Sequence, residues 1–284
     1  MNIAKVSTAA LALGAALWAL GCPSDDKGGT PTGTAKPTAK PTATGATTAA
    51  STGTAQAGEA QYGKGVIKGT VSFAGTAPEM KMPKKRAEAE FCKDNKLNHN
   101  AVLVKDGKLK DVLVAIDNGQ IKGEYEADKP AVVDQKNCEY SPRIQGVLLD
   151  QEVQVKNSDP TLHNVNAGKG ANTLFNTAQP KGAPDLKKTF EEPGIYRFKC
   201  DVHAFMRAFV IAQDNPFFAV SGEDGTFTIE KVPDGKYKVF AWHSQYGKKE
   251  QEIEVKGGEV TADFSYDGKE AEPPENQGEL AGLF

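Results

Sequence analysis

Apolar and polar residues alternate in short runs over most of the chain after about residue 65. A period of two places one set of side chains on a buried face and the other set in water, which is typical of a half-buried β-strand. The clearest runs are residues 66–73, 153–156, 196–200, 226–229, 237–242 and 251–255. The pattern predicts many short strands and an all-β protein.

One further run, residues 112–116, is apolar at every position. Such a run indicates a strand that is covered on both faces. Turn dipeptides that contain glycine, such as residues 106–107, 224–225 and 234–235, separate the runs. Many short strands with frequent turns favour β-sandwiches or barrels.

The N-terminal region lacks this pattern. A short basic start that ends at Lys5 precedes an apolar run over residues 9–20. The run is too short to span a bilayer and is typical of a secretory signal peptide, which we expect at residues 1–21. The sequence Ala-Leu-Gly-Cys that ends at Cys22 resembles a bacterial lipoprotein box, which implies a lipid on Cys22. The alternative is ordinary cleavage nearby with a free Cys22.

Residues 22–62 form a stretch of low complexity in which Thr, Ala, Gly and Pro dominate. A segment with so few large apolar residues cannot bury enough surface to fold. We therefore expect a disordered linker between the lipidated cysteine and the folded part of the chain.

Potential metal ligands cluster in residues 200–206, Cys-Asp-Val-His-Ala-Phe-Met, and His163 lies upstream of them. Alternation places the Cys200 thiol on the inward face at the end of a strand. A thiolate, two imidazoles and a thioether are the ligands of a blue-copper electron-transfer site. We therefore expect one copper ion per chain, with His163, Cys200, His203 and Met206 as its ligands.

Zinc is the main alternative to copper, because it also accepts one cysteine and two histidines. Zinc does not use methionine, and the chain has only four Met residues, of which Met206 is the only one after Met82. A thiolate and a thioether favour Cu(I), while imidazoles suit both Cu(I) and Cu(II). The ligand types therefore favour copper.

Cys92 and Cys138 remain once Cys22 and Cys200 have been assigned. An exported chain is in an oxidising environment, so a Cys92–Cys138 disulfide is the economical interpretation, and two reduced buried thiols are the alternative. His243 ends a strand and is interpreted as a hydrogen-bonded structural residue, with an approach to a second site as the alternative.

Residues 131–213 resemble a cupredoxin of the amicyanin and plastocyanin type. The motifs that carry the resemblance are an opening strand at 131–140, a strand pair at 147–157, His-Asn-Val at 163–165, Glu-Pro-Gly-Ile-Tyr at 192–196 and the Cys-x-x-His-x-x-Met loop. The resemblance implies a Greek-key β-sandwich. It also implies that His163, Cys200 and His203 are equatorial ligands and that Met206 is the axial ligand.

The same resemblance gives Asn164 a supporting role, with hydrogen bonds around the Cys200 sulfur that tie the two ligand loops together. It implies that His203 exposes an imidazole edge, ringed by apolar residues such as Phe205, where electrons enter and leave. Amicyanin-type loops carry Pro where this chain has Val202 and Ala204. That difference implies that the backbone of the copper-free loop can adopt more conformations.

The residues around this block resemble a carboxypeptidase regulatory-like, or transthyretin-like, sandwich. The motifs are Gly-Thr-Phe-Thr-Ile at 225–229, Pro-Asp-Gly-Lys-Tyr at 233–237 and the strands at 67–73 and 112–116. Because the last two precede residues 131–213, we expect a discontinuous sandwich that carries the cupredoxin as an insertion. Two β-domains in series are the alternative.

The expected organisation has six parts. They are a signal peptide at 1–21, the lipidated Cys22 and linker at 22–62, an N-terminal β segment at 63–130, the cupredoxin at 131–213, a C-terminal carboxypeptidase regulatory-like sandwich at 214–268 and a tail at 269–284. The fold class is therefore all-β, with a cupredoxin Greek-key sandwich and a second, smaller β-sandwich behind a disordered tether.

These interpretations predict a lipid-anchored, extracytoplasmic blue copper protein that carries single electrons between redox protein partners, at the outer membrane or facing the periplasm. We expect a monomer that is not an enzyme, because no acid–base pair, nucleophile–base pair or open metal position is visible. A net charge of −3 without a dense basic run does not fit nucleic-acid binding. Two alternatives stay open: a copper-binding or chaperone protein without electron transfer, and an adhesion or carbohydrate-binding β protein with a vestigial metal site.

Overall fold

The computed structural model describes residues 58–79, 91–92 and 100–276. All of them belong to the larger of two compact units, residues 53–284. The expected signal peptide, Cys22 and nearly all of the expected linker lie outside the described residues. Within the described part of the chain, no helix has the length and apolar character needed to cross a membrane.

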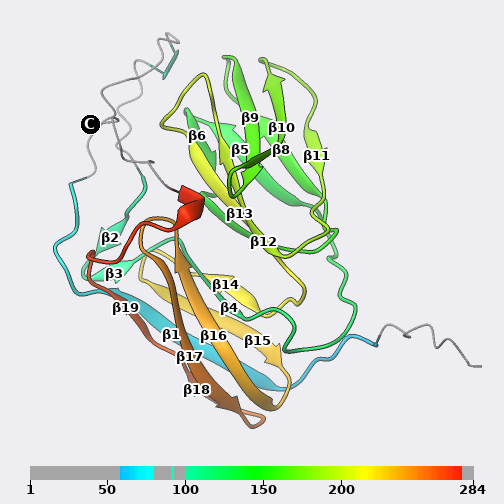
Figure 1. Ribbon diagram of the computed structural model, residues 1–284, viewed down its shortest axis with the longest axis vertical. Coiled ribbons are helices and arrows are strands. Elements are labelled where there is room, and N and C mark those ends of the chain that lie inside the picture. The colour runs from blue at the N-terminus through cyan, green and yellow to red at the C-terminus, as the bar shows by residue number, and fades with distance from the viewer. Residues whose placement is uncertain (1–57, 80–90, 93–99, 277–284) are drawn as a thin grey trace, which may run out of the picture. The chain divides into compact units, whose positions relative to one another are not determined.

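Residues 131–213 form a sandwich of two sheets (Figure 1). One sheet has five strands in the order β10 (Asn172–Gln179), β9 (His163–Lys169), β12 (Gly194–Lys199), β13 (Arg207–Gln213) and β7 (Ile144–Leu148). The other has four strands in the order β11 (Leu186–Lys188), β8 (Val153–Asn157), β5 (Ala131–Lys136) and β6 (Glu139–Ser141). Their inward-facing residues, such as Val133, Val155 and Phe198, form one apolar core.

The strands before and after this block form a second sandwich. Its larger sheet has the order β15 (Thr226–Val232), β1 (Gly65–Phe73), β3 (Lys108–Leu109) and β2 (Val104–Lys105), and β18 (Glu259–Thr261) and β19 (Phe264–Tyr266) also pair with β1. Its smaller sheet has the order β14 (Phe218–Val220), β4 (Val112–Ile116), β16 (Gly235–His243) and β17 (Gly247–Val255). Residues such as Ile67, Val239 and Phe264 fill the core between them. The all-β fold class predicted from the alternation is confirmed.

The second sandwich is assembled from segments on both sides of the first. β1 pairs with β15, β18 and β19, and β4 pairs with β14 and β16. Among the described strands, none from residues 131–213 pairs with β1. These are the pairings that an interrupted sandwich requires, with the chain leaving it after β4 and returning at β14.

Two central strands are buried on both faces and join the sandwiches. In β4, Val112 and Val114 face the core of the second sandwich, whereas Leu113 faces a third apolar cluster. In β13, Val210 faces the core of the first sandwich, and Phe209 faces the same third cluster. This shared layer explains why residues 112–116 are apolar at every position, since neither face of the strand meets water.

One glycine is needed in this layer. A Cβ added to Gly146 of β7 would lie 2.6 Å from the ring of Phe218 in β14. The close approach of β7 to β14 therefore requires a residue without a side chain.

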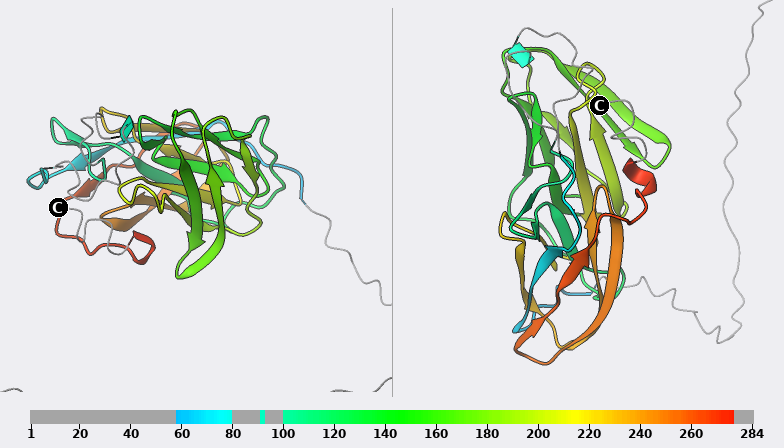
Figure 2. Two further views of the ribbon diagram at one scale, coloured as in Figure 1. Left: turned by 90° about the horizontal axis from the view of Figure 1, so that it is seen from above. Right: turned by 90° about the vertical axis from the view of Figure 1, so that its left-hand side faces the viewer.

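The C-terminal segment crosses from one sandwich to the other. A short 3-10 helix, η1 (Pro274–Asn276), lies against β12 (Figures 1 and 2). Arg197 Nη1 of β12 donates to the carbonyl of Glu275 at 3.3 Å. Asn276 Nδ2 donates to the carbonyl of Ser244, which follows β16, at 2.8 Å. Residues 274–276 of the expected tail are thus packed on the folded part.

Candidate metal centre

Strand pairing brings the start of β9 and the end of β12 to the same end of one sheet. β9 and β12 are antiparallel neighbours, with Lys199 opposite Asn166. His163 opens β9, and Cys200 directly follows β12. The pairing therefore places an imidazole and a thiol together although 37 residues separate them in the sequence.

Three donor atoms converge there. His163 Nδ1 is 2.9 Å from His203 Nδ1, and Cys200 Sγ is 3.7 Å from His203 Nδ1 and 4.0 Å from His163 Nδ1. A triangle with these sides has a centre about 2.1 Å from each corner, and bonds from a metal ion to imidazole nitrogen and thiolate sulfur are about 2.0–2.3 Å long. The three side chains fit a single metal ion without rearrangement of the donors.

The loop after Cys200 is closed by its own backbone. The Cys200 amide donates to the Met206 carbonyl at 3.2 Å, and the Met206 amide donates to the His203 carbonyl at 2.8 Å. The His203 amide points at Cys200 Sγ at 3.3 Å. Met206 is fully buried in the same apolar cluster as Cys200. The loop thus brings the thiol and the loop imidazole together and buries Met206 in the same apolar cluster as Cys200.

Asn164 ties β9 to this loop. Its Oδ1 accepts hydrogen bonds from the amides of Asp201 at 2.6 Å and Val202 at 3.3 Å, and it lies 3.4 Å from Cys200 Sγ. Proline at position 202 could not donate the second of these bonds. The chain therefore restrains its loop with a hydrogen bond at a position where amicyanin-type loops use a proline ring.

Asp201 completes this polar network. Asn164, Asn166 and Asn176 all donate to its Oδ2, at 3.2, 2.8 and 2.8 Å. Burial opposes ionisation of this carboxyl, but the hydrogen bonds from Asn166, Asn176 and Lys199 outweigh burial and lower the pKa of Asp201. A fixed negative charge therefore lies next to Cys200 in the sequence.

Asp159 supports the other imidazole and was not identified from the sequence. Its Oδ2 lies 2.8 Å from His163 Nε2. It also accepts the amides of Asn137 and Cys138, at 2.7 and 2.8 Å, in a turn where both residues have positive φ angles of 57° and 59°. A carboxylate behind a metal-binding histidine fixes the ring orientation and its tautomer. Its position four residues before His163 is a weak signal, because exposed turns commonly contain aspartate.

Burial dominates the electrostatics of the centre. It raises the pKa of the Cys200 thiol, and hydrogen bonds that involve the backbone of Asn164, His203 and Val202 oppose this shift. Burial also lowers the pKa of His163, against the effect of Asp159. A neutral imidazole is ready to coordinate, whereas the thiol must release its proton when a metal binds.

The imidazole edge of His203 is not exposed, so the expectation of an open edge at this residue is wrong. His203 is 0% exposed. The structure pairs Cys92 with Cys138 in a disulfide, and Cys92 Sγ lies 3.4 Å from His203 Nε2. Phe205 is also buried, with its ring centroid 5.9 Å from that of His203. Side chains, and not solvent, surround the imidazole, because segments distant in sequence pack over it.

Two groups of potential metal ligands occur among the described residues. One is His163, Cys200 and His203, and the other is Cys138, Asp159 and His163. The second group cannot act as a site while Cys138 is held in the disulfide. His243 belongs to neither group: it stacks on Tyr246 at 4.9 Å, and its Nδ1 accepts the amide of Gln245 at 3.2 Å.

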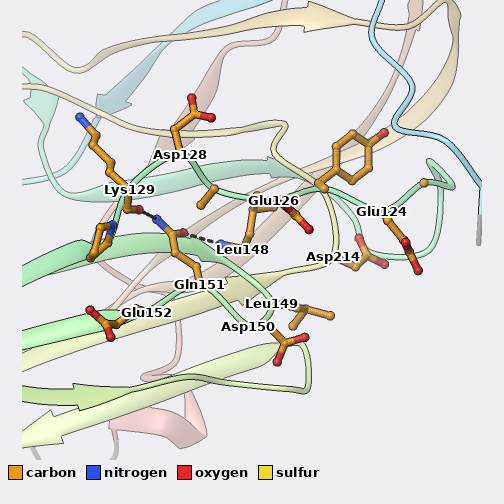
Figure 3. A pocket seen from close by; sticks show the side chains of 14 residues that line it. Glu124, Glu126, Asp128, Lys129, Leu148, Leu149, Asp150, Gln151, Glu152 and Asp214 are labelled. Carbon is orange, nitrogen blue, oxygen red and sulfur yellow. Dashed lines mark hydrogen bonds between the residues drawn. The ribbon is translucent and has the colours of Figure 1, made fainter.

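A groove of about 710 Å³ lies at the opposite end of β13 from Met206 (Figure 3). The Gln151 side chain lies in one wall of the groove: its Oε1 accepts the Leu148 N–H at 2.9 Å, and its Nε2 donates to the Lys129 carbonyl at 3.0 Å. The groove is lined by six carboxylates, from Glu124, Glu126, Asp128, Asp150, Glu152 and Asp214. It offers no imidazole or thiol, so it is separate from the metal centre.

Solved copper proteins are similar to about a third of the chain. An oxidised variant of amicyanin is 25% identical, with 35% of this chain and 91% of that chain covered and a TM-score of 0.27. A purple cupredoxin from Nitrosopumilus maritimus is 22% identical, with 35% and 97% covered and a TM-score of 0.25. A copper-containing nitrite reductase from Thermus scotoductus is 18% identical, with 34% and 25% covered and a TM-score of 0.27. No family model and no curated protein matches the chain, so its function has to be argued from the site.

Proposed function

We propose that this protein binds one copper ion at His163, Cys200, His203 and Met206 and carries single electrons. The observation that supports the proposal most strongly is the convergence of two imidazole nitrogens and one thiol sulfur on a common point. A buried methionine closes the loop that carries two of these donors. Two histidines, a cysteine and a distant methionine are the ligand set of blue-copper centres.

The ligand types support copper over zinc. Bound copper supplies a one-electron couple, and its Cu(I) state favours sulfur ligands. The chain holds its donors in place before the metal binds: Asp159 orients His163, and Asn164 restrains the loop of Cys200. A site whose ligands are fixed in this way changes little between redox states, which favours fast electron transfer.

We also propose that the protein works outside the cytoplasm, anchored by a lipid on Cys22, with redox proteins as its partners. The apolar leader and the lipoprotein-like sequence that ends at Cys22 support the anchor. The Cys92–Cys138 disulfide fits an oxidising compartment. In this proposal the protein transfers electrons and does not itself catalyse a reaction.

Titration with Cu(II) tests the metal and its ligands. We expect saturation at one copper per chain and an intense visible band from charge transfer between the Cys200 thiolate and Cu(II). The Cys200→Ser variant removes the thiolate and should lose the band. A protein that retains no copper, or whose band survives in Cys200→Ser, contradicts the proposed centre.

A second function, copper binding without electron traffic, is favoured by one observation. His203 is completely buried, so the imidazole edge is not available for direct contact with a partner. Tight Cu(I) binding without a reversible redox wave would identify this function in place of electron transfer.

A further inference from the structure

The Cys92–Cys138 disulfide covers the outer edge of the His203 imidazole. Cys92 Sγ lies 3.4 Å from His203 Nε2, a distance at which a ring N–H donates to sulfur. Cys92, Cys138 and His203 are each 0% exposed. The bridge and the imidazole are therefore both shielded from water.

The two imidazoles have different partners on their outer nitrogens. Both Nδ1 atoms face Cys200 Sγ, so each Nε2 carries the ring proton when a metal occupies the centre. His163 directs this N–H to the Asp159 carboxylate at 2.8 Å. His203 directs its N–H to the sulfur of Cys92. The Cys92 sulfur is thus the acceptor for the His203 ring N–H, as the Asp159 carboxylate is for the His163 ring N–H.

The two cysteines come from different parts of the fold. Cys92 belongs to the segment between β1 and β2, outside residues 131–213. Cys138 lies in the turn between β5 and β6, and its amide donates to Asp159. The bridge spans 46 residues of sequence, and it joins the turn that supports one imidazole to a sulfur that covers the other. A disulfide that only joined two segments would not need to contact His203, a proposed ligand of the metal.

We propose that the Cys92 sulfur of the Cys92–Cys138 disulfide is a positioning group of the metal centre. The Cys92 sulfur accepts the His203 N–H, fixes the orientation of the ring and excludes water from its edge. This inference rests on the proposed copper centre. The centre has one more positive charge in its oxidised state, and water near the ring would stabilise that charge. The Cys92 sulfur therefore favours the reduced state and raises the reduction potential.

Two single substitutions separate this role from that of a structural staple. Both break the disulfide, but only one removes the sulfur beside His203. Cys138→Ser keeps the Cys92 sulfur, whereas Cys92→Ser replaces it with a smaller hydroxyl. Each protein is loaded with Cu(I), and NMR follows the exchange of the His203 Nε2 proton with water. Voltammetry of the same proteins gives the reduction potential.

We expect slow proton exchange in the unsubstituted protein and in Cys138→Ser, and exchange at least about tenfold faster in Cys92→Ser. The ratio of Cu(II) to Cu(I) affinity should rise about tenfold in Cys92→Ser relative to Cys138→Ser, which lowers the potential by about 59 mV for a one-electron couple. Equal exchange rates and equal potentials in the two variants would show that the bridge is only a staple, and would overturn the proposal.

The unsubstituted protein decides the question if a variant does not fold. The ring proton of His163, held by Asp159, serves as an internal reference. Rapid exchange at His203 beside a protected His163 proton overturns the proposal, and protection of both supports it. Failure of the unsubstituted protein to bind copper overturns the proposed function as well, so the two failures are distinguishable.

Discussion

At the scale of single residues, polar side chains behind the metal centre fix His163 and the loop that carries Cys200 and His203. Asp159 holds His163, and Asn164 accepts two amides from the loop that begins at Cys200. These partners are hydrogen-bonded in turn, since Asp159 also accepts two backbone amides and Asn164 donates to Asp201. The donors are therefore oriented before a metal arrives, which reduces the entropy lost on binding.

The substitution Asp159→Asn should weaken copper binding about 10–100-fold, the usual cost of losing a residue that orients a metal ligand. Asparagine is nearly the same size but cannot provide the charged acceptor for His163. Competition with a chelator for Cu(II) measures the affinity. Asp185→Asn is the matched control, because Asp185 is exposed and pairs with Lys156 at the surface, at 3.7 Å. Equal affinities in the two variants would show that Asp159 does not support the centre.

The sequence predicted the donors better than their surroundings. His163, Cys200 and His203 could be predicted because their types and spacing carry the chemistry, and a strand end gives the thiol its inward direction. The contacts of Asp159 with His163 and of Cys92 with His203 could not be predicted. They depend on how a turn and a distant segment pack over the site, which alternation and spacing do not describe. The burial of His203 has the same cause.

At the scale of elements, β4 and β13 are apolar on both faces because they lie between two cores. Phe209 of β13 packs on Trp242 of β16, with ring centroids 5.2 Å apart, and the Arg143 guanidinium lies 5.6 Å from the Phe209 ring. Phe209 points to the shared layer, while its neighbours Ala208 and Val210 face the core of the first sandwich. One strand thus supports the metal-binding sandwich and its attachment.

Phe209→Ala should lower the free energy of unfolding by about 3–5 kcal/mol, the usual cost of truncating a buried phenylalanine. Denaturant titration measures this change. The visible band of the copper-loaded variant should be unchanged, because the side chain points away from the donors. Leu174→Ala is the control on an exposed residue of β10 and should change stability little. A shifted band with unaltered stability would contradict this division of roles.

The bounds of the strands show which strands the alternation of apolar and polar residues predicts and which it misses. Residues 112–116 coincide with β4, and the run at 226–229 lies inside β15. The strands β2, β3, β14 and β18 are only two or three residues long. Runs of that length hold too few positions for a period of two to be recognised. β3 and β18 pair with the longer strand β1, and β14 pairs with β4, so longer neighbours set the position of these three.

At the scale of the molecule, the described residues form two sandwiches that share an apolar layer, and the chain passes repeatedly from one to the other. It leaves the second sandwich after β4 and returns to it at β14. Near the C-terminus, Asn276 contacts both sandwiches: it donates to the Ser244 carbonyl of the second, and its Oδ1 accepts from Arg207 Nη1 of the first at 3.3 Å. Connections of this kind favour cooperative unfolding, because neither sandwich keeps its buried faces covered when the other opens.

Heating the copper-loaded protein should therefore give one transition. Trp242 lies in the shared layer and is the only tryptophan among the described residues, so its fluorescence reports on the junction, and the visible band reports on the metal centre. The two signals should change at the same temperature, as a two-state transition requires. A change in Trp242 emission that is complete before the band decays would show that the sandwiches unfold separately.

Voltammetry of the copper-loaded protein shows whether this centre carries electrons. We expect one reversible, one-electron wave that is absent from Cys200→Ser treated with the same amount of copper. A protein that binds copper stoichiometrically and yet shows no reversible wave would contradict the claim that this centre carries electrons.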